Sequence, residues 1–143
     1  IKKKMNYKII GKYIKECKFN IPNPKTFFLL TKNIENYKIN VDIKSIQVKQ
    51  NIIEVLTSLK LSSDRNDFEK IDAKIIFSVI VELSNNKLAK EEIEKIILIE
   101  VPSEVYPELR RIFVFLFENS GFKDIKISKS VDFKKLYQNR KTQ

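Results

Sequence analysis

The sequence predicts an α+β fold in which the strands come first and the helices follow. Two observations support this prediction. Within residues 12–82, apolar and polar residues alternate with a period of two in four successive segments, as in half-buried strands. Beyond residue 86, apolar residues recur every three to four positions, as on one face of a helix. No internal repeat or Gly-rich linker divides the chain, so we expect one domain over residues 1–143.

The first strand is predicted over residues 12–21, where Cys17, Phe19 and Ile21 alternate with polar residues. It ends at residues 22–24, where two prolines withhold the N–H donors that a sheet needs. On this pattern we expect Cys17 to be a buried structural thiol. The next segment, residues 25–36, is predicted to be a connection without regular structure.

Three more strands are predicted, over residues 37–48, 52–62 and 68–82. In the first of them the apolar phase slips at Ile46, as a β-bulge or bend would cause. The polar run of residues 62–67 predicts a hairpin turn between the other two. The apolar faces of the three strands consist of Tyr37, Ile39, Val41 and Ile43; Ile53, Val55, Thr57, Leu59 and Leu61; and Ile71, Ala73, Ile75, Phe77, Val79 and Val81.

Three helices are predicted in the last third of the chain. The first covers residues 88–100 and is ended by Pro102, after which Ser103 caps a second helix with Pro107 in its first turn. The second helix ends near Gly121, residues 125–127 are strand-like, and Asp132 caps the third helix. The second helix is apolar over much of its surface, which predicts either a central place in a larger core or contact with another subunit. We expect it to bury Val105, Leu109, Ile112, Phe113, Phe115, Leu116 and Phe117.

The composition argues against an enzyme. The chain contains no histidine, one cysteine and two glycines. Catalytic triads that use histidine, intrachain disulfides, thiol metal sites and Gly-rich phosphate loops are therefore excluded. The carboxylate pairs, such as Glu104 with Glu108, lie in solvated contexts and predict no metal or catalytic site.

The net charge is +10 and the isoelectric point is about 9.6, which suggests an anionic partner such as nucleic acid. Most of the basic residues are lysines, whereas recognition of phosphates favours arginine. A compositional bias toward lysine is the stronger explanation, and a basic interaction module is the alternative function. The polar stretch after residue 4 is not a signal peptide, so we expect a cytoplasmic location without membrane insertion, with Met5 a possible natural start.

Two apolar segments allow more than one interpretation. Phe27, Phe28, Leu29 and Leu30 follow the Pro-rich turn, and a second apolar set lies on the last helix. Each segment either folds over the sheet as a lid or lines an open groove that binds a partner.

Three motifs, in this order and spacing, resemble the SecB family of protein-export chaperones. They are Phe-Asn-Ile-Pro-Asn-Pro at residues 19–24, Pro-Ser-Glu-Val-Tyr-Pro-Glu-Leu-Arg at 102–110, and Val-Asp-Phe-Lys-Lys-Leu-Tyr at 131–137. The resemblance implies a four-stranded antiparallel sheet with a crossover connection and helices packed on one face. It also implies a homotetramer, built as a dimer of dimers, that binds unfolded precursors without a cofactor and delivers them to SecA.

Site residues follow from the same resemblance. The implied groove for unfolded polypeptide is flanked by Phe27, Phe28, Leu29, Phe133, Leu136 and Tyr137. The implied oligomer interface consists of Val105, Leu109, Ile112, Phe113 and Leu116. The positions that match the acidic SecA-docking residues of the family are Glu16, Asn20, Ile76 and Ser78. Glu16 alone keeps a negative charge, so we expect docking to SecA to be weak or altered.

Overall fold

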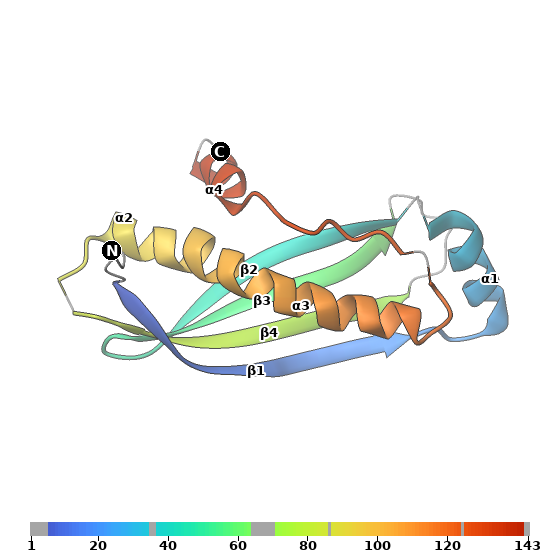
Figure 1. Cartoon of the computed structure of the whole chain (residues 1–143), viewed down its shortest axis with the longest axis horizontal. Helices are drawn as coiled ribbons and strands as arrows, with labels where there is room; N and C mark the ends of the chain where they lie inside the picture. The colour runs from blue at the N-terminus through green and yellow to red at the C-terminus, as the bar shows by residue number, and fades with distance from the viewer. Residues whose placement is uncertain (1–5, 35–36, 64–70, 86, 124, 142–143) are drawn as a thin grey trace.

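The computed structural model describes residues 6–34, 37–63, 71–85, 87–123 and 125–141 of the chain (Figure 1). Its sheet has the strand order β1-β4-β3-β2, and every neighbouring pair is antiparallel. The strands are β1 (Tyr7–Asn20), β2 (Tyr37–Lys49), β3 (Ile52–Ser63) and β4 (Asp72–Leu83). The helices are α1 (Pro24–Asn33), α2 (Lys90–Lys95), the π-helix η2 (Ile96–Glu100), α3 (Val101–Glu118) and α4 (Phe133–Lys141). The predicted fold class is confirmed.

The two edge strands, β1 and β2, are consecutive in the chain, so the segment between them crosses from one side of the sheet to the other. This crossover contains α1, and the prediction of an irregular connection is wrong. Asn23 caps the helix, because its Oδ1 accepts hydrogen bonds from the backbone N of Thr26 at 2.8 Å and from the Thr26 hydroxyl at 2.9 Å. Pro24 then occupies the first helical position, where it withholds no needed donor.

β1 begins earlier than predicted and is irregular. Its pairing with β4 shifts between Ile9 and Gly11 and again between Ile14 and Glu16. Each shift inserts a residue and breaks the period of two, which hides the first half of the strand from pattern analysis. The prediction of a buried Cys17 is also wrong: this thiol is exposed, because β1 is an edge strand whose helix-facing side is only partly covered.

The other strands follow their predicted faces. Residues 53–61 of β3 and 73–81 of β4 alternate as expected and bury their odd-numbered side chains, and Ile71, just before β4, is buried as well. In β2 the irregularity lies between Gln47 and Lys49, slightly later than the predicted slip at Ile46. The start predicted for the fourth strand, residues 68–70, lies outside the described residues, as does most of the predicted hairpin turn.

Pro102 does not end a helix. α2, η2 and α3 follow one another without a break, so Ser103 and Pro107 lie inside the helix and not at a cap or in a first turn after a break. The π-helical turn lies directly before Pro102. Because proline has no N–H and its ring crowds the preceding turn, the wider π-turn lets the chain pass this residue without stopping.

The end of α3 is set by Gly121, whose φ is +96°. The N–H of Phe122 donates to Phe117 at 3.0 Å and that of Gly121 donates to Glu118 at 3.4 Å, the pattern of a Schellman cap. The strand-like segment at residues 125–127 is irregular in the structure, and that prediction is wrong. The predicted cap of the last helix is confirmed, since Asp132 accepts a hydrogen bond from the N–H of Lys135 at 3.0 Å.

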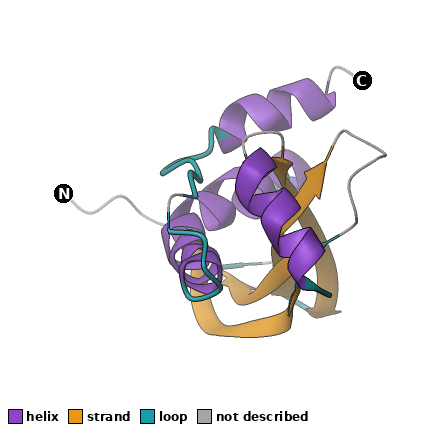
Figure 2. Ribbon diagram, turned by 90° about the vertical axis from the view of Figure 1, so that its right-hand side faces the viewer, coloured by secondary structure: helices purple, strands orange, loops and turns teal. Residues whose placement is uncertain are grey.

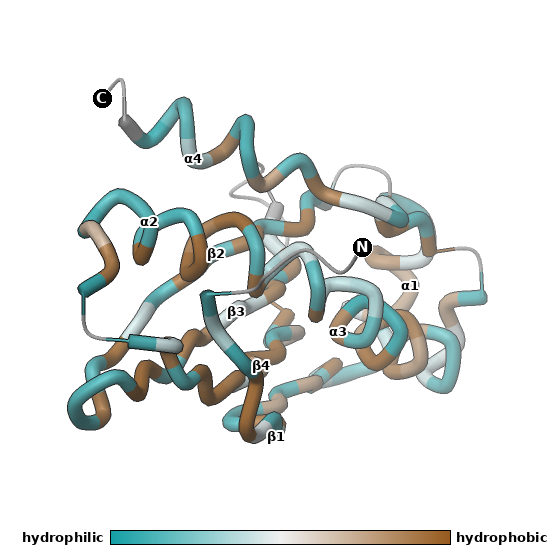
Figure 3. Tube along the Cα trace, turned by 60° about the vertical axis from the view of Figure 1, so that its left-hand side comes forward, coloured by the Kyte–Doolittle hydropathy of each residue, from teal (hydrophilic) through white to brown (hydrophobic). Residues whose placement is uncertain are grey.

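The core lies between one face of the sheet and α3. The helices that the structure describes lie on that side of the sheet, and none of them covers the opposite face (Figure 2). Brown apolar and teal polar residues alternate along the strands (Figure 3), so each strand has one face suited to the core. Fully buried side chains from the sheet and helix include Val55, Leu59, Ile75, Val79, Val105, Leu109, Phe113 and Phe117.

The packing of the core predicts that alanine substitutions at two phenylalanines will have very different effects on the stability of the protein. Phe113 is 0 % exposed and Phe28 is 67 % exposed. We expect Phe113→Ala to lower the free energy of unfolding by about 3–5 kcal/mol, because it leaves a cavity between α3 and the sheet. Phe28→Ala, the matched control, should cost less than about 1 kcal/mol. Urea denaturation of both variants tests this, and equal losses would contradict it.

Candidate polypeptide-binding surface

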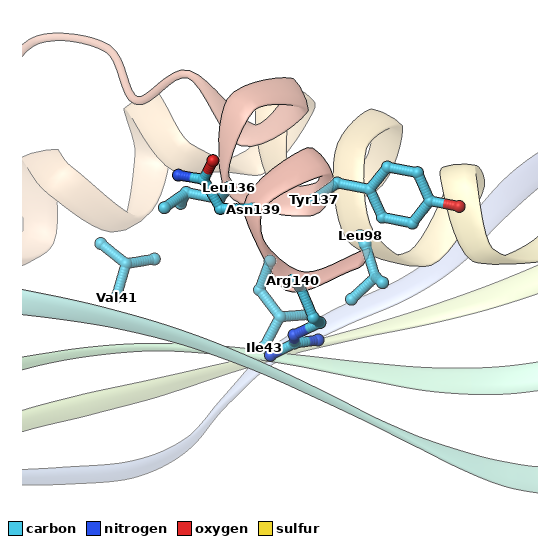
Figure 4. A pocket seen from close by; sticks show the side chains of 7 residues that line it. All are labelled: Val41, Ile43, Leu98, Leu136, Tyr137, Asn139 and Arg140. Carbon is cyan, nitrogen blue, oxygen red and sulfur yellow. The ribbon is translucent and has the colours of Figure 1, made fainter. Parts of the chain in front are cut away.

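A pocket of about 210 Å³ opens between the edge strand β2 and the helices η2 and α4 (Figure 4). Val41 and Ile43 of β2 and Leu98 of η2 supply apolar walls, and α4 supplies the remainder. Arg140 reaches from α4 toward β2 beside Ile43, which places a cation at the mouth of an otherwise largely apolar pocket. The lining residues are Val41, Ile43, Leu98, Leu136, Tyr137, Asn139 and Arg140.

The three predicted groove residues of α4 have different roles. Leu136 is exposed and lines the pocket. Phe133 is buried and its ring packs edge-on against Tyr106, with centroids 6.0 Å apart. Tyr137 lines the pocket but is mostly buried, and its hydroxyl donates to Glu94 of α2 at 3.2 Å. Phe133 and Tyr137 therefore anchor the helix, and Leu136 offers the contact surface.

The loop before α4 is also fixed to α3. The Tyr106 hydroxyl donates to the carbonyl of Ser128 at 2.6 Å, and Nε of Arg110 donates to the carbonyl of Ile127 at 3.0 Å. Burial raises the pKa of Tyr106, so this hydroxyl stays protonated and remains a donor. These bonds could not be predicted from the sequence, because both acceptors are backbone carbonyls.

The other predicted groove residues lie on α1, at a distance from α4 (Figure 1). Phe27 is half-buried, with its ring centroid 5.1 Å from that of Phe122. Leu29 is half-buried, and Phe28 points away from the core. The structure therefore places α1 and α4 in separate regions of the molecule, and the lining of the pocket under α4 includes no residue of α1.

β2 connects these two regions. Its helix-facing residues Tyr37, Ile39, Val41 and Ile43 are all half-buried, whereas the residues between them are exposed. Tyr37 lies soon after α1 in the chain, and Ile43 lies in the pocket under α4. At about 3.3 Å per residue, this apolar row of β2 spans roughly 20 Å, the length of about six extended residues.

A second apolar surface lies along the edge strand β1. Ile14 pairs with the core residue Phe77, so it faces the helix side, yet it remains exposed. Beside it, α3 is held to β1 through Glu104, which accepts from the Tyr7 hydroxyl at 3.1 Å, and through Glu108. These bonds give the glutamates a structural role that the sequence did not reveal.

The interface residues predicted on α3 divide into two groups. Val105, Leu109 and Phe113 are buried against the chain's own sheet, so they cannot contact a second chain. Ile112 and Leu116 are half-buried. The prediction that α3 buries Phe115 is wrong, because this ring is 60 % exposed.

The spacing of residues along α3 explains why Phe115 lies near the edge strand β1. Residues 104, 108, 112 and 115 lie on one face of α3, the face that is held to β1. We call Ile14, Cys17, Ile112 and Phe115 the β1-edge surface. Phe115 was predicted to be buried because it belongs to the apolar pattern of the helix. Ile14 was not placed on the apolar face of its strand, because the irregularity between Ile14 and Glu16 breaks the period of two.

The four positions predicted for docking lie on the face of the sheet that has no helices. Glu16 pairs with Ile76, and Asn20 pairs with Asp72. Ser78 pairs with Tyr13 and is completely buried. The shared parity is thus consistent with one outward face, but Ser78 offers no accessible surface to a partner.

Ser78 is covered by Glu54, a carboxylate that the sequence analysis overlooked. Glu54 lies on β3, is 8 % exposed, and accepts hydrogen bonds from Ser78 at 2.6 Å and from the Tyr13 hydroxyl. Lys15 lies 3.3 Å away as its ion-pair partner. These hydrogen bonds, that from Ser78 first, lower the pKa of the Glu54 carboxyl. The signal in the sequence that could have identified Glu54 is a single glutamate within an otherwise apolar strand.

Two classes of feature are absent from the described part of the chain. Within it, no cluster of three or more His, Cys, Asp or Glu side chains is arranged to hold a metal ion. None of its helices combines the length and the apolar character required to cross a membrane.

Comparison with known proteins finds relatives that match nearly the whole length of the chain. The sequence profile of the family described as preprotein translocase subunit SecB matches residues 2–143. A SecB protein of Pelagibacter ubique, assigned to protein export, is 42 % identical over 135 residues, covering 94 % of this chain and 96 % of that protein. Protein-export protein SecB of Rhodospirillum rubrum is 29 % identical over 135 residues, covering 92 % and 80 %.

A solved structure has a similar fold. The SecB-like chaperone of Mycobacterium tuberculosis, determined in complex with a ChAD peptide from an antitoxin, superposes with a TM-score of 0.52. The alignment covers 86 % of this chain and 90 % of that one at 9 % identity.

Glu54 predicts an acid dependence of stability. Its carboxyl has a folded-state pKa below the ordinary value of 4.5, so the stabilisation is present above that pH and is lost as the pH falls through the folded-state pKa. We expect Glu54→Gln to be less stable than the parent chain at pH 7, with a difference that shrinks at about pH 3.5. Chemical denaturation at both pH values measures this, with the exposed Glu118→Gln as control. A difference that did not change with pH would contradict the assignment.

Proposed function

The chain belongs to the SecB family of protein-export chaperones, and on this premise we propose that it is an ATP-independent holdase for unfolded precursors. The observation that carries the proposal is the apolar row of β2 with its pocket under α4. Members of this family act as chaperones and not as enzymes. The mechanism is therefore physical: the surface binds apolar segments that a folded precursor would hide.

The size of the apolar row sets the strength of one contact. Each 100 Å² of apolar surface removed from water contributes roughly 2.5 kcal/mol before the cost of ordering the client. A groove that holds about six residues thus binds one segment weakly. Several such grooves in one oligomer would engage one client together, and linked weak contacts then give useful affinity.

The two ends of the proposed groove offer a client different kinds of contact. At one end, exposed Phe28 and half-buried Phe27 and Leu29 of α1 provide large apolar contacts. At the other end, Leu136 supplies the apolar contact and Arg140 supplies a cation that suits client carbonyls or carboxylates. Half-buried Val131 belongs to the segment that leads into α4. No nucleotide is required for binding of this kind.

We further propose that the active form is a tetramer, a dimer of dimers, in the cytoplasm. The β1-edge surface supports this assembly, since it places exposed Ile14 and Phe115 beside the free edge of β1. An edge strand next to exposed apolar side chains is a surface that natural proteins cover. Half-buried Leu116 extends the surface along α3.

Transfer of the client to SecA is part of the same proposal, with weakened docking. Glu16 is the one acidic side chain at the four docking positions, and it already forms ion pairs with Lys18 at 3.3 Å and Lys74 at 4.0 Å. A basic SecA tail would have to displace these lysines, which lowers the gain from charge complementarity. A nucleic-acid function is less favoured, because Arg110 is occupied by a backbone carbonyl and Arg140 lines the apolar pocket.

The function is tested by light scattering on a size-exclusion column, with a permanently unfolded protein as the client. We expect a tetramer that co-elutes with the unfolded client and not with its folded counterpart. Leu136→Ser should weaken client binding by about threefold to tenfold, since it removes the exposed apolar contact of α4. Gln138→Ser, an exposed change on the same helix, should leave binding unchanged. A chain that ignores unfolded clients would refute the holdase proposal.

The assembly is tested separately. Phe115→Ser should shift the oligomer toward smaller species, because the ring is exposed in the single chain and contributes little to its own core. Arg111→Ser, an exposed neighbour, should leave the molar mass unchanged. Analytical ultracentrifugation over a range of concentrations gives the readout, and an unaltered tetramer for Phe115→Ser would place the interface elsewhere.

A further inference from the structure

Three lysines lie directly opposite one another on the helix-free face of the sheet. Lys18 of β1 pairs with Lys74 of β4, and Lys74 pairs with Lys60 of β3. We call these residues the lysine row. Like charges at directly opposed positions destabilise a sheet. Local rules of stability are broken mainly at functional sites, so this row is a candidate site for a ligand of opposite charge.

The sheet neutralises this row only in part. Lys18 and Lys74 share the single carboxylate of Glu16, at 3.3 and 4.0 Å. Within the part of the chain that the structure describes, Lys60 forms no ion pair, and neither does Lys44 on β2. The other nearby carboxylates are Asp42, beside Lys44 on β2, and Asp72, which pairs with Asn20 at the end of β4.

A shallow hollow of about 70 Å³ adjoins the lysine row. Leu56 and Ile76 supply apolar side chains to its lining, and Lys44 and Lys74 supply ammonium groups. The complete lining is Asp42, Lys44, Leu56, Ser58, Lys74 and Ile76. An apolar contact flanked by ammonium groups suits a ligand that combines an apolar side chain with carboxylates on either side.

We propose that the lysine row and this hollow form a docking site for an acidic segment of a partner protein. An apolar side chain of the segment enters the hollow, and its carboxylates lie over Lys60, Lys74 and Lys44. The site lies on the same face as Glu16 and Ile76 but prefers a ligand of the opposite charge to a basic tail. It does not depend on the client groove, which lies on the helix side of the sheet.

A peptide fits this surface better than nucleic acid does. Glu16, Asp42 and Asp72 are interspersed with the lysines, so a continuous phosphate backbone would meet carboxylates at close range. A peptide can place its separate carboxylates where the ammonium groups lie. The cations are lysines, which act as point charges, and not the arginine forks that favour phosphates.

Fluorescence anisotropy with two labelled peptides tests the proposal. The first repeats Glu-Glu-Leu-Glu-Glu, and the second has lysine in place of each glutamate. We expect the acidic peptide to bind and to weaken as salt is raised, whereas the basic peptide stays free. Stronger binding of the basic peptide would overturn the proposal. Displacement of the acidic peptide by a single-stranded oligonucleotide at equal concentration would overturn the choice of a protein partner.

Two double variants of equal net charge locate the site. Lys60→Gln with Lys74→Gln should weaken binding of the acidic peptide by about threefold to tenfold. Lys126→Gln with Lys129→Gln, both exposed in the loop before α4, should have no such effect. Equal losses in the two variants would show that net charge alone attracts the peptide and would overturn the site.

Two further measurements exclude trivial causes. The urea midpoint of the Lys60→Gln, Lys74→Gln variant should not fall, because the change removes repulsion between opposed lysines. Its binding of an unfolded client should match that of the parent chain, which separates this site from the holdase groove. A lower midpoint together with weaker binding of both peptide and client would attribute the effect to misfolding and would contradict the proposal.

Discussion

The long helix α3 is narrower than the four-stranded sheet that it has to cover. The rest of the structure depends on this difference in width. A helix with its side chains is about 10 Å across, whereas four strands at about 4.8 Å spacing extend over roughly 14 Å between their outer axes. α3 buries the central strands β3 and β4 with side chains such as Leu109 and Phe113. The edge strands are left with helix-facing residues that are only partly covered.

The two uncovered edges have different neighbours, which gives them different roles. At β2, the short helix α4 is held over the edge by buried Phe133 and Tyr137 and leaves a pocket beneath Leu136. This arrangement presents apolar surface to a flexible client in a partly sheltered place. At β1, no described element covers Ile14 from the side, and Phe115 of α3 continues the apolar surface. That broader surface suits a rigid partner such as a second chain.

The sequence predicted the central strands well because β3 and β4 are regular and have one fully buried face. It predicted the edge strand β1 and the connections poorly for physical reasons. The bulges of β1 conceal its first half, and the exposure of Cys17 depends on how far α3 reaches, which no local pattern encodes. The α1 helix was missed although Asn23 and Pro24 are a readable start signal. The prediction that a helix ends at Pro102 was wrong because a π-turn can carry the helix past a proline. The site residues came from family resemblance, and the structure then separated those that anchor α4 from the one that is exposed.

The π-turn at Ile96–Glu100 also has a consequence for how this chain tolerates insertions and deletions. A π-turn contains one residue more than an α-helical path of the same rise, so it amounts to an insertion stored inside the helix. Loss of one residue there would restore a regular α-helix and leave the residues before it in nearly the same orientation relative to α3, because the extra residue is accommodated within the turn itself. Glu94 would then stay beside Tyr137, and α4 would keep a contact that holds it over β2. A deletion at another point between Glu94 and α3 would have no stored residue to remove, so it would turn everything before it by about 100° and change the shape of the groove.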